Sequence, residues 1–176
     1  MTDCYSCTIA EGKGKGYQAR EYVVELDGGW ILDHCAEKEK TYLGYLILAT
    51  KKHRKDLQHL SLEERRTLGM NLEAINHSLR KYWRDHSDEF DDRIERVHVA
   101  YLNEGPFINK DKNMNKSHVH FHVLPRTTKM MPRRSRNRIG WSLLELVDKF
   151  PEYLRSSDTE KKALMLYLKH ALPGPG

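Results

Sequence analysis

The ten residues SHVHFHVLPR, at positions 117–126, alternate histidine with apolar residues. Successive side chains of a β-strand point to opposite faces of the sheet. A strand here therefore places the three histidines on one face and the apolar residues between them on the other. The histidines are His118, His120 and His122, and the apolar residues are Val119, Phe121 and Val123. The pattern predicts a half-buried strand with a buried back and a chemically active front.

Three uses of such a histidine face can be weighed on the residues alone. A solvated, inert face is disfavoured because the alternation with apolar residues is strict. A metal site is a serious alternative. However, alternate residues lie about 6.6 Å apart along a strand, so three histidines span about 13 Å and do not converge easily on one ion. A division of labour is therefore predicted, with one imidazole as nucleophile. Neutral histidine is available near pH 7 and can form a covalent intermediate with phosphorus.

The rest of the chain predicts an α+β domain with an antiparallel sheet of about five strands, a long helix and a C-terminal helical extension. Besides the histidine strand, strand-like segments occupy 17–26, 30–34, 43–50 and 97–102. Ser61 and Glu64 form a capping box that opens the long helix, and its apolar stripe has spacings of three and four. The stripe consists of Leu68, Leu72, Ile75, Leu79 and Trp83. Further helices are predicted at 141–150 and 159–172, the second with a capping box at Ser157 and Glu160.

Length and composition bound the class of protein. The 176 residues suffice for one domain with a hydrophobic core. We expect a core at 1–126, a basic loop at 127–140 and a helical extension of the same domain at 141–176. No apolar run approaches the roughly 20 residues of a membrane span, and the N-terminus lacks the apolar stretch of a secretory signal, so a cytoplasmic protein is expected. The net charge of +5 favours anionic partners without separating nucleotides from nucleic acid.

The stretch HVHFHVL resembles the His-x-His-x-His-x-x signature of the histidine triad (HIT) superfamily, in which x is apolar. Three other stretches are similar to the family: Pro125-Arg126, GYLILATKKHRKDLQHLSLEE at 44–64 and LNEG at 102–105. The resemblance covers roughly residues 4–126, and it is to dinucleotide hydrolases of the fragile-histidine-triad type and to zinc-containing bacterial members. An HIT-like fold is therefore expected.

This resemblance implies a nucleotide hydrolase or nucleotidyl transferase that attacks an α-phosphate through a covalent nucleotidyl-histidine intermediate. His120 is implied as the nucleophile and His122 as a donor to a phosphate oxygen. The implied substrates are dinucleoside polyphosphate-like compounds or nucleoside phosphoramidates. Two alternatives stay open: removal of adenylate from nucleic-acid ends, and a nucleotide-binding regulator without turnover. A homodimer is also implied by the resemblance.

The resemblance further implies residues that bind substrate, although the pattern departs from the family in places. The candidates are Asn103, Asn115, Ser117 and Glu37. The run NMNKS stands where the family often has Gly-Gln-Ser. The frequent Gly-His before the apolar strand is Gly44-Tyr45 here, and the usual proline before Lys-x-His is Thr50. These departures leave the chemistry intact and the leaving group open.

The cysteine pair in CYSC, at residues 4–7, is a candidate metal or redox motif. A thioredoxin-like site requires the pair to open a helix, and the following TIAEGKGKG predicts none; a chance pair is the other alternative. In the zinc-containing members that the chain resembles, such a pair joins the histidine of Lys-x-His and the first triad histidine. The corresponding residues are Cys4, Cys7, His53 and His118. Two sulfurs and two imidazoles form a closed tetrahedral set, as expected of structural zinc.

A basic segment follows the histidine strand. It contains Arg126, Lys129, Arg133, Arg134, Arg136 and Arg138. It is interpreted either as a solvated loop or as a guide for anions, which can be a polyphosphate or nucleic acid. The small nucleotide is favoured over nucleic acid because no aromatic residues on which bases stack are interleaved with these arginines.

Overall fold

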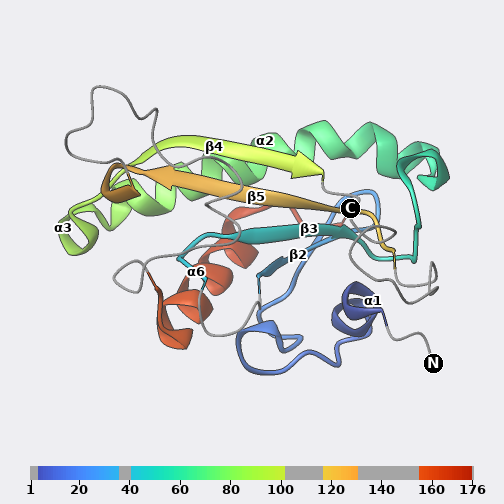
Figure 1. Ribbon diagram of the computed structural model, residues 1–176, viewed down its shortest axis with the longest axis horizontal. Helices are drawn as coiled ribbons and strands as arrows, with labels where there is room; N and C mark the ends of the chain where they lie inside the picture. Colours follow the sequence, from blue (N-terminus) through green and yellow to red (C-terminus); the bar gives the residue numbers. More distant parts are fainter. Residues whose placement is uncertain (1–3, 36–40, 102–116, 131–154, 176) are drawn as a thin grey trace, which may run out of the picture.

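The computed structural model describes residues 4–35, 41–101, 117–130 and 155–175. Its centre is an antiparallel sheet of five strands in the order β1-β2-β3-β5-β4 (Figure 1). The strands are β1 (Val24–Leu26), β2 (Trp30–His34), β3 (Leu46–Thr50), β4 (Ile94–Tyr101) and β5 (His120–Thr127). This sheet and its helices confirm the predicted α+β class.

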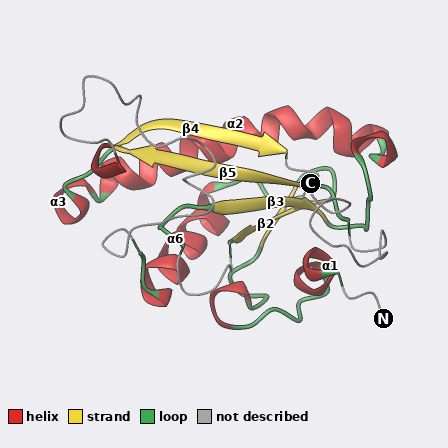
Figure 2. Cartoon of the chain, viewed as in Figure 1, coloured by secondary structure: helices red, strands yellow, loops and turns green. Residues whose placement is uncertain are grey.

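Helices flank the sheet in the described part of the chain (Figure 2). They are α1 (Tyr5–Ala10), α2 (Leu62–Asp85), α3 (Ser87–Phe90) and α6 (Asp158–Ala171), with short 3-10 helices η1 (Gly16–Gln18), η2 (Leu57–His59) and η4 (Thr128–Met130). Both predicted capping boxes are present, at the starts of α2 and α6. The helix predicted at 141–150 lies outside the described residues. Among the helices described, none has the combination of length and apolar character that spanning a bilayer requires.

The back of the sheet packs against α2 and α6. One hydrophobic cluster joins apolar side chains of all five strands to both helices. Trp30 is fully buried in it; its ring centroid lies 5.9 Å from that of Phe121, and its indole N–H donates to the Glu64 carbonyl at 3.0 Å. Phe121 and Val123 belong to this cluster, so the residues that alternate with them in β5 face the other side. Burial of the apolar back thus directs the histidines to the front.

The strand register aligns two rows of residues on the front face. Residues directly opposite each other in neighbouring antiparallel strands share a face. One row consists of Glu25, Ile31, Ala49 and His120, and the other of Asp33, Ile47 and His122. Because neighbouring strands lie about 4.8 Å apart, Ile31 is about 10 Å from His120. The front face therefore carries two continuous rows of side chains from β1 and β2 to the histidines of β5, and Ile31, Asp33 and Ala49 within these rows are buried.

Residues 17–23 do not form the predicted strand; they form η1 and a turn. The reason is a tertiary contact. The Gln18 Nε2 donates to Asp33 Oδ2 at 2.8 Å and to the His34 carbonyl at 3.0 Å, both at the end of β2. These buried hydrogen bonds hold the segment against the sheet and outweigh the β-preference of its tyrosine and valine residues.

Three other strand boundaries shift. β3 begins at Leu46 rather than at residue 43, because residues 43 and 44 make a turn. β4 begins at Ile94, inside the charged run predicted to end the long helix, since a strand at the sheet edge can expose charged side chains. β5 begins at His120, so His118 and Val119 precede the regular strand.

A first prediction concerns the contribution of helix α6 to the stability of the protein. Leu164 is fully buried between α6 and the sheet, so Leu164→Ala should lower the free energy of unfolding by about 3 kcal/mol through lost burial and a residual cavity. Equilibrium urea unfolding, followed by tryptophan fluorescence, measures this change. Leu166→Ala is the matched control, because Leu166 is 41% exposed on the same helix. We propose that α6 folds as part of the same domain; a second, separate transition in the Leu164→Ala variant would contradict this.

Candidate active site and metal centre

Two cysteines and two histidines meet beside the start of β5. The ligand atoms of Cys4, Cys7, His53 and His118 all lie within 4.8 Å of one another. Sulfur–nitrogen separations are 3.2 Å from Cys4 Sγ to His118 Nδ1, 3.3 Å from Cys7 Sγ to His53 Nδ1 and 3.5 Å from Cys7 Sγ to His118 Nδ1. On a tetrahedral zinc with Zn–S of about 2.3 Å and Zn–N of about 2.0 Å, such atoms are about 3.5 Å apart. The donor atoms and their spacing therefore fit a tetrahedral metal ion.

The cysteine pair opens a helix, so the expectation that none follows it is wrong. Cys4 is the N-cap of α1 and Cys7 lies in its first turn, and both side chains are buried. No disulfide is present among the three cysteines of the chain, all of which are described. A helical turn brings residues three apart onto one side. Both sulfurs therefore approach the same pair of imidazoles.

His118 is oriented by a hydrogen bond on the opposite side of its ring. Its Nε2 lies 2.7 Å from the Thr50 carbonyl oxygen, which only accepts, so this nitrogen carries the proton. The Thr50 hydroxyl lies 3.0 Å from the same nitrogen. Burial lowers the pKa of His118 to about 4. The ring is therefore neutral at pH 7 and presents its Nδ1 lone pair to the cysteines, as metal-binding histidines do.

The loop that carries His53 also holds the start of the triad strand. The Val119 N–H donates to the Arg54 carbonyl at 2.7 Å. The Arg54 Nε donates to the buried carboxylate of Glu64 at 3.0 and 3.1 Å. Burial alone would raise the pKa of Glu64, but hydrogen bonds from Ser61 and Arg54 outweigh it and lower that pKa. The start of α2, the loop that carries His53 and the triad strand are thereby joined into one unit.

His120 is the middle triad histidine, and one of its ring nitrogens is hydrogen-bonded to the backbone. Its Nδ1 lies 2.8 Å from the backbone carbonyl oxygen of His118. A carbonyl cannot donate, so Nδ1 carries the proton, and Nε2 of the neutral ring has the lone pair. The side chain is partly exposed on the front face. This tautomer is the one that a nucleophile attacking through Nε2 requires.

His122 is hydrogen-bonded to a residue of the neighbouring strand region. Its Nδ1 lies 2.7 Å from the Tyr45 hydroxyl oxygen, and its ring centroid is 4.9 Å from that of His120. Burial, and to a lesser degree the nearby His120, lowers the pKa of His122 to about 4. His122 is therefore neutral at pH 7 and has one N–H to donate.

A glycine turn positions Tyr45. Gly44 has a φ of 85°, and a Cβ on it would lie 2.9 Å from both Pro125 Cγ and Trp83 Cη2. The Gly44 N–H donates to His34 Nε2 at 3.1 Å, while His34 Nδ1 faces the Cys35 carbonyl at 3.2 Å. Only glycine combines this backbone conformation with so close an approach. The turn therefore delivers Tyr45 to the triad face.

Several residues predicted from sequence lie outside the described part of the chain. These are Asn103, Asn115 and Glu37, together with four residues of the basic segment, Arg133, Arg134, Arg136 and Arg138. Ser117 is described, partly buried just before His118. In the remainder of the basic segment, Arg126 lies in β5 on the triad face, and the Lys129 ammonium donates to the Phe90 carbonyl.

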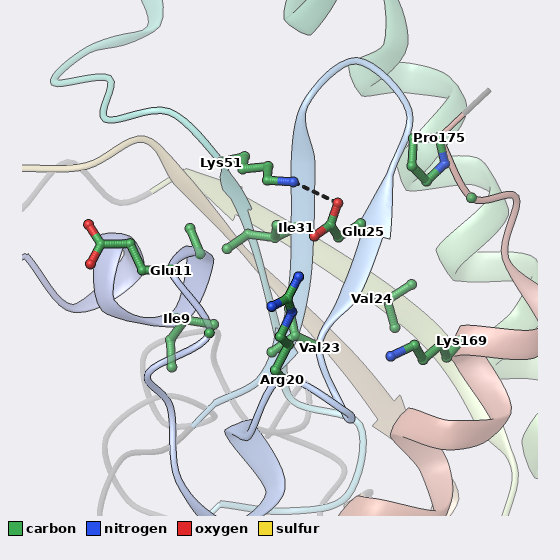
Figure 3. A pocket seen from close by; sticks show the side chains of 13 residues that line it. Ile9, Glu11, Arg20, Val23, Val24, Glu25, Ile31, Lys51, Lys169 and Pro175 are labelled. Atoms are coloured by element: carbon green, nitrogen blue, oxygen red, sulfur yellow. Dashed lines mark hydrogen bonds and ion pairs between the residues drawn. The ribbon is translucent and has the colours of Figure 1, made fainter.

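A cavity of about 440 Å³ opens at the β1 edge of the sheet, between α1, the β1–β2 hairpin and the end of α6, where Lys169 and Pro175 also line it (Figure 3). Its apolar wall includes Ile9, Val23 and Ile31, and Ile31 shares a row with His120. Arg20 and Lys51 bring positive charge to it, although Lys51 pairs with Glu25 at 2.7 Å. The cavity therefore lies around the edge of the sheet, and the part of its wall formed by Ile31 shares the face of the nucleophile candidate.

Sequence reasoning missed three residues of this site. Tyr45 and Thr50 were noted only as departures from the family pattern, and each contacts a triad histidine. Asp33 was not singled out, yet it lies in the row of His122, and burial raises its pKa to about 7 despite the Gln18 hydrogen bond. Their positions were the available signal: Asp33 alternates with Ile31 in a predicted strand, and Tyr45 and Thr50 flank the apolar run that precedes Lys-x-His.

No protein-family profile and no curated protein sequence matches the chain, but solved structures do. An HIT-like protein from Bartonella henselae, described as involved in cell-cycle regulation, aligns with a TM-score of 0.56 at 12% identity over 98% of each chain. A hypothetical histidine triad nucleotide-binding protein from Sulfolobus tokodaii aligns with a TM-score of 0.55 at 14% identity, over 96% of this chain and 91% of that one. The NitFhit protein of C. elegans gives 0.50 at 14% identity, over 88% of this chain and 28% of that one.

Likeness at these identities establishes the fold. The chain has the histidine triad fold, with His120 and His122 at the start of β5 and His118, just before the strand, in the cysteine–histidine cluster. The resemblance drawn from HVHFHVL is thus confirmed at the level of the fold.

Proposed function

We propose that the chain is a nucleotide hydrolase or nucleotidyl transferase that works through a covalent nucleotidyl-His120 intermediate. The observation that carries the proposal is the 2.8 Å contact between His120 Nδ1 and the His118 carbonyl, which leaves the lone pair on Nε2. The fold adds support, because one solved structure that shares it is described as nucleotide-binding. Dinucleoside polyphosphate-like compounds and nucleoside phosphoramidates are the proposed substrates.

The reaction divides into two displacements at the α-phosphorus. In the first, His120 Nε2 forms a bond to phosphorus while the bond from phosphorus to the leaving oxygen or nitrogen breaks. The positive charge that this leaves on the imidazole is stabilised by the His118 carbonyl at Nδ1–H. In the second, water attacks phosphorus and loses one proton to solvent, the N–P bond breaks, a nucleoside monophosphate is released and His120 is neutral again. His122 donates to a phosphate oxygen in both steps.

The proposed metal is structural zinc held by Cys4, Cys7, His53 and His118. Two thiolates and two neutral imidazoles would complete a tetrahedral shell and leave no position for substrate. Zinc held there would join the N-terminus and the His53 loop to the first triad histidine. Since the His118 carbonyl also orients His120, this chain's own residues connect the metal site to the nucleophile.

We place the nucleoside of the substrate on the front face, towards the cavity beside α1. Ile9, Val23 and Ile31 provide apolar contacts for a base in this cavity, and the α-phosphate lies beside His120 and His122. The homodimer implied by resemblance remains a proposal, which light scattering in solution tests.

A trapping experiment tests the function. Wild-type protein is mixed with a dinucleoside polyphosphate, an adenosine 5′-phosphoramidate or an adenylated DNA end, and quenched without acid because the N–P bond is acid-labile. We expect mass spectrometry to find adenylate on the peptide that contains His120, together with released AMP from one of the first two substrates. An adduct on another residue contradicts the assignment, and binding without adduct or turnover across the panel favours the non-catalytic regulator.

The same panel addresses nucleic acid as an alternative substrate. A chain that tracks nucleic acid through phosphate contacts binds it with a log–log salt slope of about −0.7 to −0.9 per contact. We expect weak oligonucleotide binding at physiological salt. Tight, steeply salt-dependent binding to the adenylated end, with turnover of that substrate alone, would replace the small nucleotide by a nucleic-acid end.

A further inference from the structure

Tyr45 occupies a position that the proposed chemistry leaves without a role. It is 2% exposed, and its ring centroid lies 5.8 Å from that of Tyr42. Both tyrosines belong to a second cluster of buried residues, the front-face cluster, which also contains Ile9, Val23, Ile31, Cys35, Ile47, Ala49, Leu124 and Met130. Its hydroxyl oxygen lies 2.7 Å from His122 Nδ1. A buried phenol placed this close to an imidazole forms a hydrogen bond whose direction decides which nitrogen of His122 carries the proton.

The two possible directions have opposite consequences at the substrate. If Tyr45 donates, His122 Nδ1 accepts, and the single proton of the neutral ring is on Nε2. If Tyr45 accepts, the proton is on Nδ1 and Nε2 presents a lone pair. A phosphate oxygen is an acceptor, so the first arrangement attracts it and the second repels it.

We propose that the Tyr45 hydroxyl donates to His122 Nδ1 and thereby holds His122 as the Nε2–H tautomer that hydrogen-bonds the transferred phosphate. Tyr45 is a positioning residue: it acts through His122 and does not touch the reacting atoms. The inference deepens the proposed function and rests on it for its catalytic consequence. The tautomer itself is a property of the protein without substrate.

The surrounding structure supports this geometry. The turn at Gly44 packs closely against Pro125 and Trp83, and a larger side chain at 44 would collide with both. This packing fixes the backbone position of Tyr45. His122 is held opposite Ile47 in the sheet, on the same face as Tyr45's apolar neighbours. Both partners are thus fixed by backbone and packing before substrate arrives, which lowers the cost of orienting the donor.

The test is Tyr45→Phe, which removes only the hydroxyl and keeps the aromatic ring. In ¹⁵N-labelled protein without substrate, we expect wild-type His122 to show a protonated Nε2 and an unprotonated Nδ1, and the variant to show a mixture of both tautomers. Turnover number should fall about 10- to 100-fold, as when the group that orients a functional histidine is removed. KM and Tm should change little, because binding and packing are retained. Tyr42→Phe, which removes a hydroxyl from the same cluster, is the matched control and should leave the His122 tautomer unchanged.

The outcomes separate this inference from the proposed function. A wild-type His122 with its proton on Nδ1, or a tautomer unaltered by Tyr45→Phe, overturns the role of Tyr45 whether or not the protein turns over nucleotides. A wild type that forms no nucleotidyl-His120 overturns the proposed function, and the tautomer measurement still decides the hydrogen bond. An active variant with a full wild-type turnover number also overturns the positioning role.

Discussion

His120→Ala is expected to reduce nucleotide turnover by at least about 10³-fold, because the covalent route disappears with the nucleophile. Nucleotide affinity should remain within a few-fold of wild type, since the proposed contacts to base and phosphate come from other residues. His122→Ala should cost less, about 10²-fold, since it removes a donor and not the nucleophile. Steady-state rates on the best substrate of the panel, together with calorimetric binding of AMP, measure both effects.

The control for this pair is His77→Ala. His77 is an exposed histidine on α2, in the described part of the chain and outside the triad. Its replacement should leave turnover and binding unchanged. Near-normal turnover in the His120→Ala protein would refute the nucleophile, and a loss of AMP binding equal to the loss of turnover would point to a binding role in place of a covalent one.

Cys4→Ser should abolish metal binding, lowering the zinc content from one ion per chain to nearly none. Cys4 Sγ is 3.2 Å from His118 Nδ1 in a buried cluster, and a serine hydroxyl is a far weaker ligand for zinc than a thiolate. A metal bound at about 1,000 times its Kd stabilises a protein by about 4 kcal/mol, so Tm should fall by about 10 °C. Elemental analysis and thermal unfolding measure the two effects.

Cys35→Ala provides the comparison, because Cys35 is likewise buried but belongs to the front-face cluster and not to the metal cluster. It should keep one zinc per chain. Carefully purified wild type without metal would refute the site. Spectroscopic evidence that one ion is bound by all three triad histidines would refute the division of labour between His118 and the other two.

The parts of the fold that follow from local chemistry were predictable from sequence. The capping boxes at Ser61 and Ser157 begin α2 and α6, and the alternation in β5 sorts its side chains between the two faces. The proximity of Cys4 and Cys7 to His53 and His118 followed from family resemblance, and the structure brings these four side chains together. The roles assigned to them, and to His120 and His122, remain proposals.

Contacts between segments that are distant in the sequence could not be predicted from the sequence. The segment at 17–23 has strand-like composition, and the hydrogen bonds of Gln18 to Asp33 and to the His34 carbonyl explain why it turns. Similarly, the sequence shows Tyr45 only as a replacement for the histidine of the family's frequent Gly-His pair. The structure places its hydroxyl oxygen 2.7 Å from His122 Nδ1. Hydrogen bonds between residues separated by many positions leave no periodic signal, so pattern analysis cannot detect them.

The sequence separation within the metal cluster has a consequence for biosynthesis. Cys4 and His118 are 114 positions apart, so the fourth ligand is made long after the first. At about 5–20 residues per second, roughly 6 to 23 seconds pass between their synthesis. During that interval the nascent chain offers at most the two cysteines and His53, an incomplete shell for the proposed zinc. If zinc is bound as we propose, tight retention would begin only once His118 has left the ribosome and β5 has docked on β3, so a chain interrupted before residue 118 would exchange its zinc readily.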